Sequence, residues 1–157
     1  MKKERNLIFC FIFLLISYGL SLFLLNKIGL INYWFFAGLF FLGVYLLIKS
    51  YTYRSDSSLF LGVLIFSFSI FGAVSKYLSL GGLQIASLTI LSLAFSFLAN
   101  YLFFGKTTIF NTFLFFILLF LPLILFSFYC INLLLMILLI CGDIAIVLTL
   151  QFSGKYE

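Results

Sequence analysis

The chain contains 157 residues, of which 66% are hydrophobic and only 8% are charged. A soluble domain is about 45–50% apolar and about 25% charged, so this chain lacks the polar residues that a soluble surface needs. Nine Lys and Arg residues against four acids give a net charge of +5. They stand singly between apolar runs and form no patch that follows a phosphate backbone. The composition excludes a soluble fold and a nucleic-acid partner, and it predicts one integral membrane domain over residues 1–157.

Six apolar stretches approach the length of about 20 residues that a helix needs to cross the hydrocarbon core of a bilayer. Their bounds are 7–25, 31–48, 58–75, 83–104, 108–126 and 131–150. No charged turn divides residues 108–150, but Pro122, followed by Ser127 and Asn132, predicts a turn there. We therefore expect an all-α polytopic bundle of six transmembrane helices in three hairpins. Models with four or five spans stay open.

The basic residues beside the spans predict the orientation, because Lys and Arg collect on the cytoplasmic side. With the N-terminus inside, the outer side holds only Lys27 and Lys76. The inner side holds Lys2, Lys3, Arg5, Lys49, Arg54, Lys106 and Lys155. Both termini are therefore expected in the cytoplasm. The first span is expected to be a retained signal anchor, since no small-residue cleavage site follows it.

Two apolar segments place a glycine in similar surroundings. Residues 40–44 contain Gly43, and residues 60–63 contain Gly62. One interpretation is a repeated helical hairpin, with Lys27 and Lys76 each at an outer turn. The alternative is that apolar sequence of low complexity always resembles itself.

Residues 7–104 resemble the membrane module of LiaI/LiaF-type envelope-stress proteins of bacteria. The resemblance rests on an apolar helix that carries Gly19, an Asn-x-x-Gly turn from Asn26 to Gly29, and a return helix led by Trp34. Phe35 stands where that family usually has proline, and the last hairpin has no counterpart. The resemblance implies a non-enzymatic accessory or sensing role in the bacterial cytoplasmic membrane.

Asp143 is the one acid well inside a predicted span. It stands about seven residues from the inner end of the last predicted helix, which is roughly 10 Å deep. An ionisable group at such a position costs about 2.5–3.5 kcal/mol on insertion scales and is a functional candidate by default. Asn111 and Lys106, at the inner start of the preceding helix, are candidates to bond or pair with it. The functional interpretation is a proton, cation or substrate-amine site. The structural alternative is an Asp that is protonated or hydrogen-bonded to a neighbouring helix or to a partner subunit.

A second candidate feature is one face of the predicted helix 83–104. It carries Ala86, Thr89, Ser92, Ser96 and Ala99 at spacings of three and four. Small residues permit close helix approach, and hydroxyls can bond across the interface. Ser67, Ser69 and Gly72 of the preceding helix are expected to supply a matching surface. A polar groove for a small ligand is the alternative.

The remaining chemistry is sparse. Histidine is absent, and Cys10, Cys130 and Cys141 are expected at different depths, which predicts neither disulfides nor a metal site. The motifs of metalloproteases, serine hydrolases and phosphate-binding loops are also missing. We expect no catalytic activity and no cofactor.

These observations favour a small non-catalytic protein of the bacterial cytoplasmic membrane. Its expected role is that of an accessory, sensor or assembly subunit. Its expected partners are the lipid bilayer and other membrane proteins or copies of itself, which it contacts through helix faces. The alternative is a small-solute transporter or the substrate-binding membrane component of a larger one.

The predicted orientation is testable by cysteine accessibility in a background from which the three native cysteines have been removed. In intact cells, Lys27→Cys and Lys76→Cys are expected to react with an impermeant maleimide, because both positions lie at outer turns. Arg54→Cys is the matched inner position and is expected to react only after lysis. Labelling of Arg54→Cys in intact cells would contradict the orientation.

Overall fold

A computed structural model describes residues 2–105, 107–127 and 133–153. In these residues the chain forms six α-helices and one short 3-10 helix, with no strand. Their bounds are α1 Lys2–Lys27, η1 Ile31–Tyr33, α2 Trp34–Tyr53, α3 Asp56–Tyr77, α4 Gly82–Phe104, α5 Thr107–Ser127 and α6 Leu133–Ser153. The prediction of six helices is confirmed. By length and composition, α1 to α4 are long and apolar enough to cross a membrane.

The helix ends follow the local signals in the sequence. At the end of α1, Gly29 adopts a left-handed φ of 73°, and the Leu30 amide donates to the Leu25 carbonyl at 2.8 Å. This is a Schellman C-cap, for which glycine is favoured because it has no Cβ. Pro122 lies inside α5, and the helix ends at Ser127, where the predicted turn begins.

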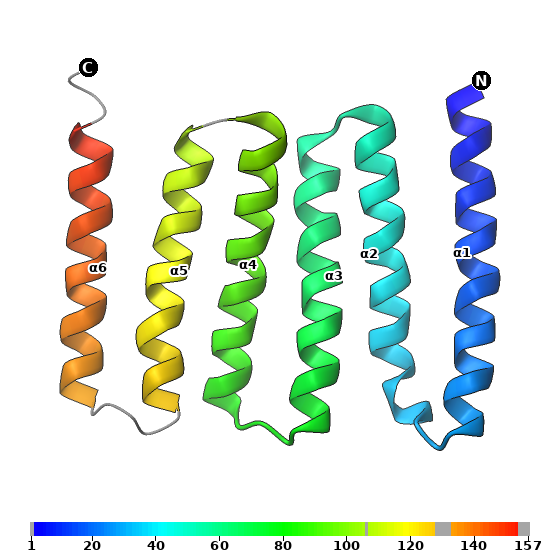
Figure 1. Cartoon of the computed structure of the whole chain (residues 1–157), viewed down its shortest axis with the longest axis horizontal. Helices are drawn as coiled ribbons and strands as arrows, with labels where there is room; N and C mark the ends of the chain where they lie inside the picture. Colours follow the sequence, from blue (N-terminus) through cyan, green and yellow to red (C-terminus); the bar gives the residue numbers. More distant parts are fainter. Residues whose placement is uncertain (1, 106, 128–132, 154–157) are drawn as a thin grey trace. The chain divides into compact units, whose positions relative to one another are not determined.

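The chain divides into two compact units, Met1–Tyr77 and Leu78–Glu157. In the first unit, α2 contacts both α1 and α3, and consecutive helices run antiparallel (Figure 1). In the second unit, α5 contacts both α4 and α6 in the same manner. The most extensive interfaces are α2–α3 and α4–α5. In two of the expected hairpins, α1–α2 and α5–α6, the two helices are therefore in contact. The pairing of α3 with α4 joins two units and stays a prediction, as does the single domain.

A two-residue turn joins α2 to α3. Arg54 adopts a left-handed φ of 52°, and its backbone amide donates to the Ser50 carbonyl. The hydroxyl of Ser50 donates to the Ser55 carbonyl at 3.0 Å. Since a carbonyl at a helix end has no partner within the helix, these bonds close the end of α2 and reverse the chain sharply.

Glycines on both helices allow the backbones of α2 and α3 to approach each other closely. A Cβ added to Gly43 would lie 2.8 Å from the Phe66 backbone nitrogen, and one added to Gly62 would lie 3.0 Å from the Leu47 nitrogen. Each glycine thus faces the residue four positions after the other one. The similar surroundings of the two glycines therefore have a packing role: they are the two halves of one antiparallel contact. Close backbone approach at small residues is the usual way in which membrane helices gain packing energy.

In the second unit, aromatic rings fill the α4–α5 interface. The Phe97 and Phe116 rings stack with centroids 5.4 Å apart, and the Tyr101 and Phe110 rings are 4.9 Å apart. Gly105 ends α4 with a left-handed φ of 68°, and its amide donates to the Tyr101 carbonyl at 2.7 Å. Ring contacts of this kind contribute about 0.5–1.5 kcal/mol beyond the area they bury.

Substitution of Gly43 by alanine tests the α2–α3 contact. Because the new Cβ would lie 2.8 Å from backbone rather than from a flexible side chain, the helices must separate, at a cost of about 1–3 kcal/mol. Gly19→Ala is the matched control, since nothing lies within 4 Å of a Cβ there. In a thermal denaturation series in mild detergent, Gly43→Ala is expected to lower the midpoint and Gly19→Ala to leave it unchanged or raise it. Equal midpoints for the two variants would contradict the close contact.

Candidate functional site

Asp143 lies at the middle of α6, ten residues from each end of Leu133–Ser153. The helix continues to Ser153, beyond the predicted end at residue 150. Asp143 is therefore about 15 Å from the helix end at 1.5 Å per residue, farther from that end than predicted. Asp143 is half-buried, as are Met136 and Ile140, which lie at spacings of three and four on the same side of α6. Since α5 is the helix of this unit that α6 contacts, this half-buried side is the one that packs against α5.

Of the expected partners of Asp143, the structure describes only the backbone of Asn111. The antiparallel connection from Ser127 to Leu133 places Asp143 level with about residue 117 of α5. Asn111 lies six residues further along α5, about 9 Å away along the helix axis. The side chain of Asn111 and the whole of Lys106 lie outside the described residues. The proton, cation or amine site therefore stays a hypothesis that rests on Asp143.

The predicted small-residue face of α4 is buried in its central part. Ser92 and Ser96 have no exposed surface. Thr89 and Ala99 are half-buried, and Ala86 is exposed. The Ser96 hydroxyl donates to the Ser92 carbonyl at 2.8 Å, and the Thr89 hydroxyl donates to the Ile85 carbonyl at 2.9 Å. The hydroxyl protons are thus used within the helix, four residues back, rather than across an interface.

The surface expected to match that face also differs from the prediction. The hydroxyls of Ser67 and Ser69 donate to carbonyls of their own helix, those of Val63 and Phe66. Gly72 packs against the Phe36 ring of α2, because the α2–α3 interface continues past the Gly43–Gly62 contact. Gly72 therefore serves α2, and the proposed match between α3 and α4 stays a prediction.

Asn100 on α4 is a buried polar residue that the sequence interpretation overlooked. Its side chain is 7% exposed, and in the part of the chain that the structure describes its Oδ1 atom accepts no hydrogen bond. It follows Ser92 and Ser96 at steps of four, which is the signal that would have found it. A buried acceptor without a donor costs about 1–3 kcal/mol, so Asn100 is a local weak point of α4.

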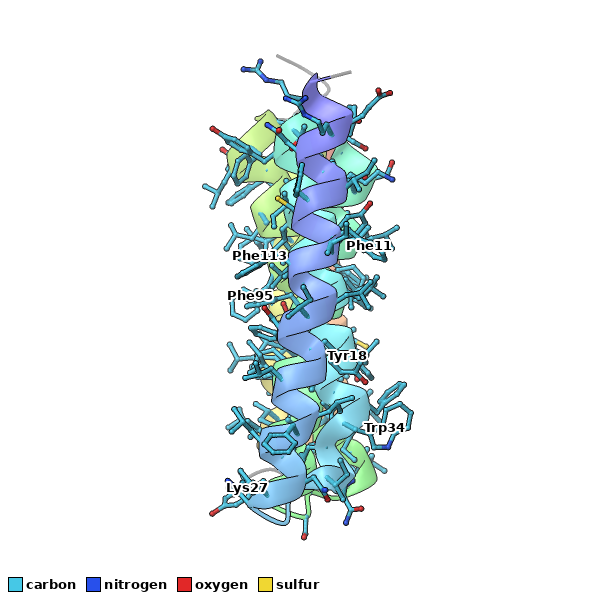
Figure 2. The ribbon with its side chains drawn as sticks, turned by 90° about the vertical axis from the view of Figure 1, so that its right-hand side faces the viewer. Phe11, Tyr18, Lys27, Trp34, Phe95 and Phe113 are labelled. Atoms are coloured by element: carbon cyan, nitrogen blue, oxygen red, sulfur yellow. The ribbon has the colours of Figure 1, made fainter. Side chains whose placement is uncertain are left out.

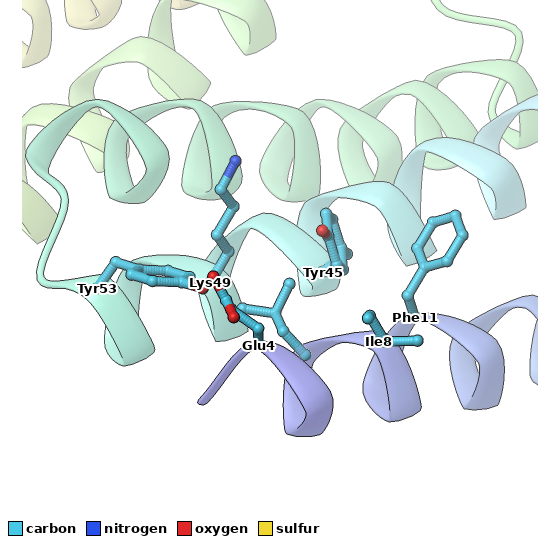
Figure 3. Close-up of a pocket in the computed structure, with 7 residues that line it drawn as sticks. Glu4, Ile8, Phe11, Tyr45, Lys49 and Tyr53 are labelled. Carbon is cyan, nitrogen blue, oxygen red and sulfur yellow. The ribbon is translucent and has the colours of Figure 1, made fainter. Parts of the chain in front are cut away.

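A cleft of about 460 Å³ opens between the start of α1 and the end of α2. It is lined by Glu4, Leu7, Ile8, Phe11, Tyr45, Lys49 and Tyr53. Figure 3 shows Ile8 and Phe11 on the α1 side of the cleft and Tyr45, Lys49 and Tyr53 on the α2 side. The Phe11 and Tyr45 rings meet edge to face with centroids 5.3 Å apart. The cleft thus combines an acid, a base and two phenols with an apolar floor.

The opposite end of the same unit carries the two lysines that were predicted outside. Lys76 Nζ donates to the Asn32 carbonyl at 2.6 Å and lies 5.1 Å from the centre of the Tyr33 ring. Lys27 lies 5.9 Å from the centre of the Phe23 ring and is near the same end as Trp34 (Figure 2). The contacts of Lys76 connect the end of α3 to the turn between α1 and α2.

The other candidate chemistry is limited. The described residues contain no group of three or more His, Cys, Asp or Glu side chains that could hold a metal ion. Cys10 is half-buried and Cys141 is exposed, both as free thiols, while Cys130 lies outside the described residues. No family model, curated protein or solved structure matches the chain. The likeness to LiaI/LiaF-type proteins therefore rests on the sequence features given above.

Proposed function

We propose that the chain is a small non-catalytic protein of a bacterial cytoplasmic membrane, with six spans in three hairpins and both termini in the cytoplasm. Its role in this proposal is that of an accessory, sensor or assembly subunit that binds other membrane proteins, or a second copy of itself, through helix faces. Helices α5 and α6 then cross the membrane in addition to α1–α4.

The distribution of charge in the first unit supports the orientation. Lys27 and Lys76 lie in the last turns of α1 and α3. Arg5 lies at the start of α1, and Lys49 and Arg54 lie at the end of α2. Because consecutive helices are antiparallel (Figure 1), the first pair shares one end of the unit and the other three residues share the opposite end. The larger basic group is expected on the cytoplasmic side.

The observation that carries the proposed role is the exposure of α1. No residue in its most apolar 18-residue window is buried, and α1 contacts α2 and the η1 turn within its unit. Its outward side carries an apolar stripe whose members are each at least 60% exposed: Phe9, Phe13, Ile16, Leu20 and Phe23. The stripe advances in steps of four and three, the 3.5-residue period by which two helices interlock side chains.

The stripe also favours a protein that binds a membrane partner over one that acts alone. A helix with no buried residue in its apolar window adds little to the packing of its own unit. Its packing energy must come from lipid or from another helix. A regular row of large side chains can insert between the side chains of such a helix. We therefore propose that the outward side of α1 is the partner-binding surface.

Matched leucine substitutions test this surface. Leu20 belongs to the stripe, and Leu15 lies on the same helix outside it at 53% exposure. In quantitative mass spectrometry of proteins that co-purify in mild detergent, Leu20→Ala is expected to lower the recovery of a bound membrane protein about fivefold, which corresponds to about 1 kcal/mol. Leu15→Ala is expected to leave the recovery unchanged. Equal recovery with both variants would exclude the stripe as the binding surface.

The second candidate function is transport of a small solute, as a carrier or as the membrane component that binds the substrate of a larger transporter. The position of Asp143 favours it, because a half-buried carboxyl at mid-helix depth marks ion and substrate pathways in many membrane proteins.

Asp143→Asn distinguishes the two functions because it removes the charge and keeps the size. If the chain transports a solute, native mass spectrometry of the wild type is expected to show a bound small molecule at a fixed stoichiometry, and Asp143→Asn is expected to lose it. Asp56→Asn, in the first turn of α3, is the control and is expected to retain it. A wild-type protein that carries a membrane partner and no small molecule would count against transport.

A further inference from the structure

The cleft between α1 and α2 is large enough for a small ligand or for part of a lipid, and it lies at one end of the unit. Its volume of about 460 Å³ is within the range of about 300–1,000 Å³ that is typical of small-molecule sites. From Glu4 to Phe11 its α1 wall runs seven residues, about 10 Å along the helix. The cleft therefore begins at the end of the unit and extends toward the middle of the helices.

The lining changes character along this depth. Glu4 and Lys49 mark its charged part, one on each helix, and Tyr53 lies in the last turn of α2. Leu7, Ile8 and Phe11 form the apolar part, and Figure 3 shows Phe11 beyond Ile8 on the side away from Glu4 and Tyr53. A ligand that fits must have a polar group at the helix ends and an apolar tail directed along the helices.

The charges of Glu4 and Lys49 also restrict which headgroup a ligand in the cleft can carry. A cluster of Lys and Arg alone attracts anionic lipids, but a carboxylate in the same cleft repels a purely anionic headgroup. Glu4 and Lys49 together complement a headgroup that carries both a phosphate and an ammonium. A primary ammonium donates charge-assisted hydrogen bonds to a carboxylate, whereas a quaternary ammonium has no N–H to donate.

The cleft is open to ligands that are dissolved in the bilayer. Both of its walls are helices long and apolar enough to cross a membrane, and the side chains of Ile8 and Phe11 are 60% and 46% exposed. An apolar tail can therefore enter sideways between α1 and α2 without leaving the hydrocarbon.

We propose that the α1–α2 cleft binds one zwitterionic glycerophospholipid of the phosphatidylethanolamine class. In this site the phosphate contacts Lys49, the ammonium contacts Glu4, and one acyl chain lies on Leu7, Ile8 and Phe11 beside the Tyr45 ring. The looseness of the α1–α2 interface, compared with α2–α3, is then the space that the acyl chain fills. This inference does not depend on the proposed partner, because the cleft and the outward stripe of α1 lie on different sides of that helix.

Native mass spectrometry of the full chain in detergent tests the site with phosphatidylethanolamine, phosphatidylcholine and phosphatidylglycerol of identical acyl chains. Phosphatidylethanolamine is expected to bind as a single copy with the lowest apparent Kd. Glu4→Gln and Lys49→Met are each expected to raise that Kd about threefold to fivefold, the size of one partly exposed ion pair. Asp56→Asn and Lys76→Met remove the same kinds of charge outside the cleft and are expected to leave it unchanged.

A photoreactive phosphatidylethanolamine with a diazirine in its acyl chain gives an independent readout of position. Crosslinks are expected on peptides that contain Phe11 and Tyr45. Equal Kd values for the three lipids, a lower Kd for phosphatidylglycerol, no effect of Glu4→Gln, or crosslinks confined to other helices would each overturn the proposal. Since these measurements need no protein partner, their failure is distinguishable from failure of the proposed accessory role.

Discussion

The structure depends first on the need of every backbone N–H and C=O group to find a partner inside a chain that is 66% hydrophobic. In hydrocarbon a helix meets this need within one segment, and all six long elements are helices. The serine and threonine hydroxyls obey the same constraint. Those of Ser67, Ser96 and Thr89 donate to carbonyls four residues back in their own helices. These hydroxyls are thus bonded within their own helices, and side-chain packing determines which helices associate.

Packing distinguishes the helices because side-chain size varies where hydropathy does not. Gly43 and Gly62 let the α2 and α3 backbones approach closely, whereas α1 presents the Phe11 and Tyr18 rings to α2, with Tyr45 and Phe41 as their partners. Rings hold the helices further apart than glycines do. The same difference produces a tight α2–α3 pair, a loosely attached α1, a cleft beside it and an apolar stripe on its outward side. The features proposed for binding are therefore consequences of where the small residues stand.

The sequence predicted the helices well, because hydropathy, charge and turn residues act over short distances. Lys27 and Gly29 mark the end of α1, and Ser127 ends α5 where the predicted turn begins. The candidate site was predicted less well. Asp143 was placed too near a helix end, because the apolar run stops at Leu150 whereas the helix continues through Gln151 and Phe152 to Ser153. The cleft was not predicted at all, since Glu4 and Lys49 are far apart in the chain and line one cleft only when α1 and α2 pack antiparallel.

The sequence by itself determined that the protein is built of six helices, where each of them lies, and which residues are costly in an apolar environment. These properties depend on composition within a single segment, and free energies of transfer are nearly additive along it. Only the tertiary structure decided that Gly72 packs on α2, that Asn100 is buried and that a cleft opens between α1 and α2. When almost every side chain on every face is apolar, hydropathy no longer distinguishes one face from another. Which faces pack together is then determined by the shapes of their side chains, and the fit between two shapes exists only in the packed pair of helices.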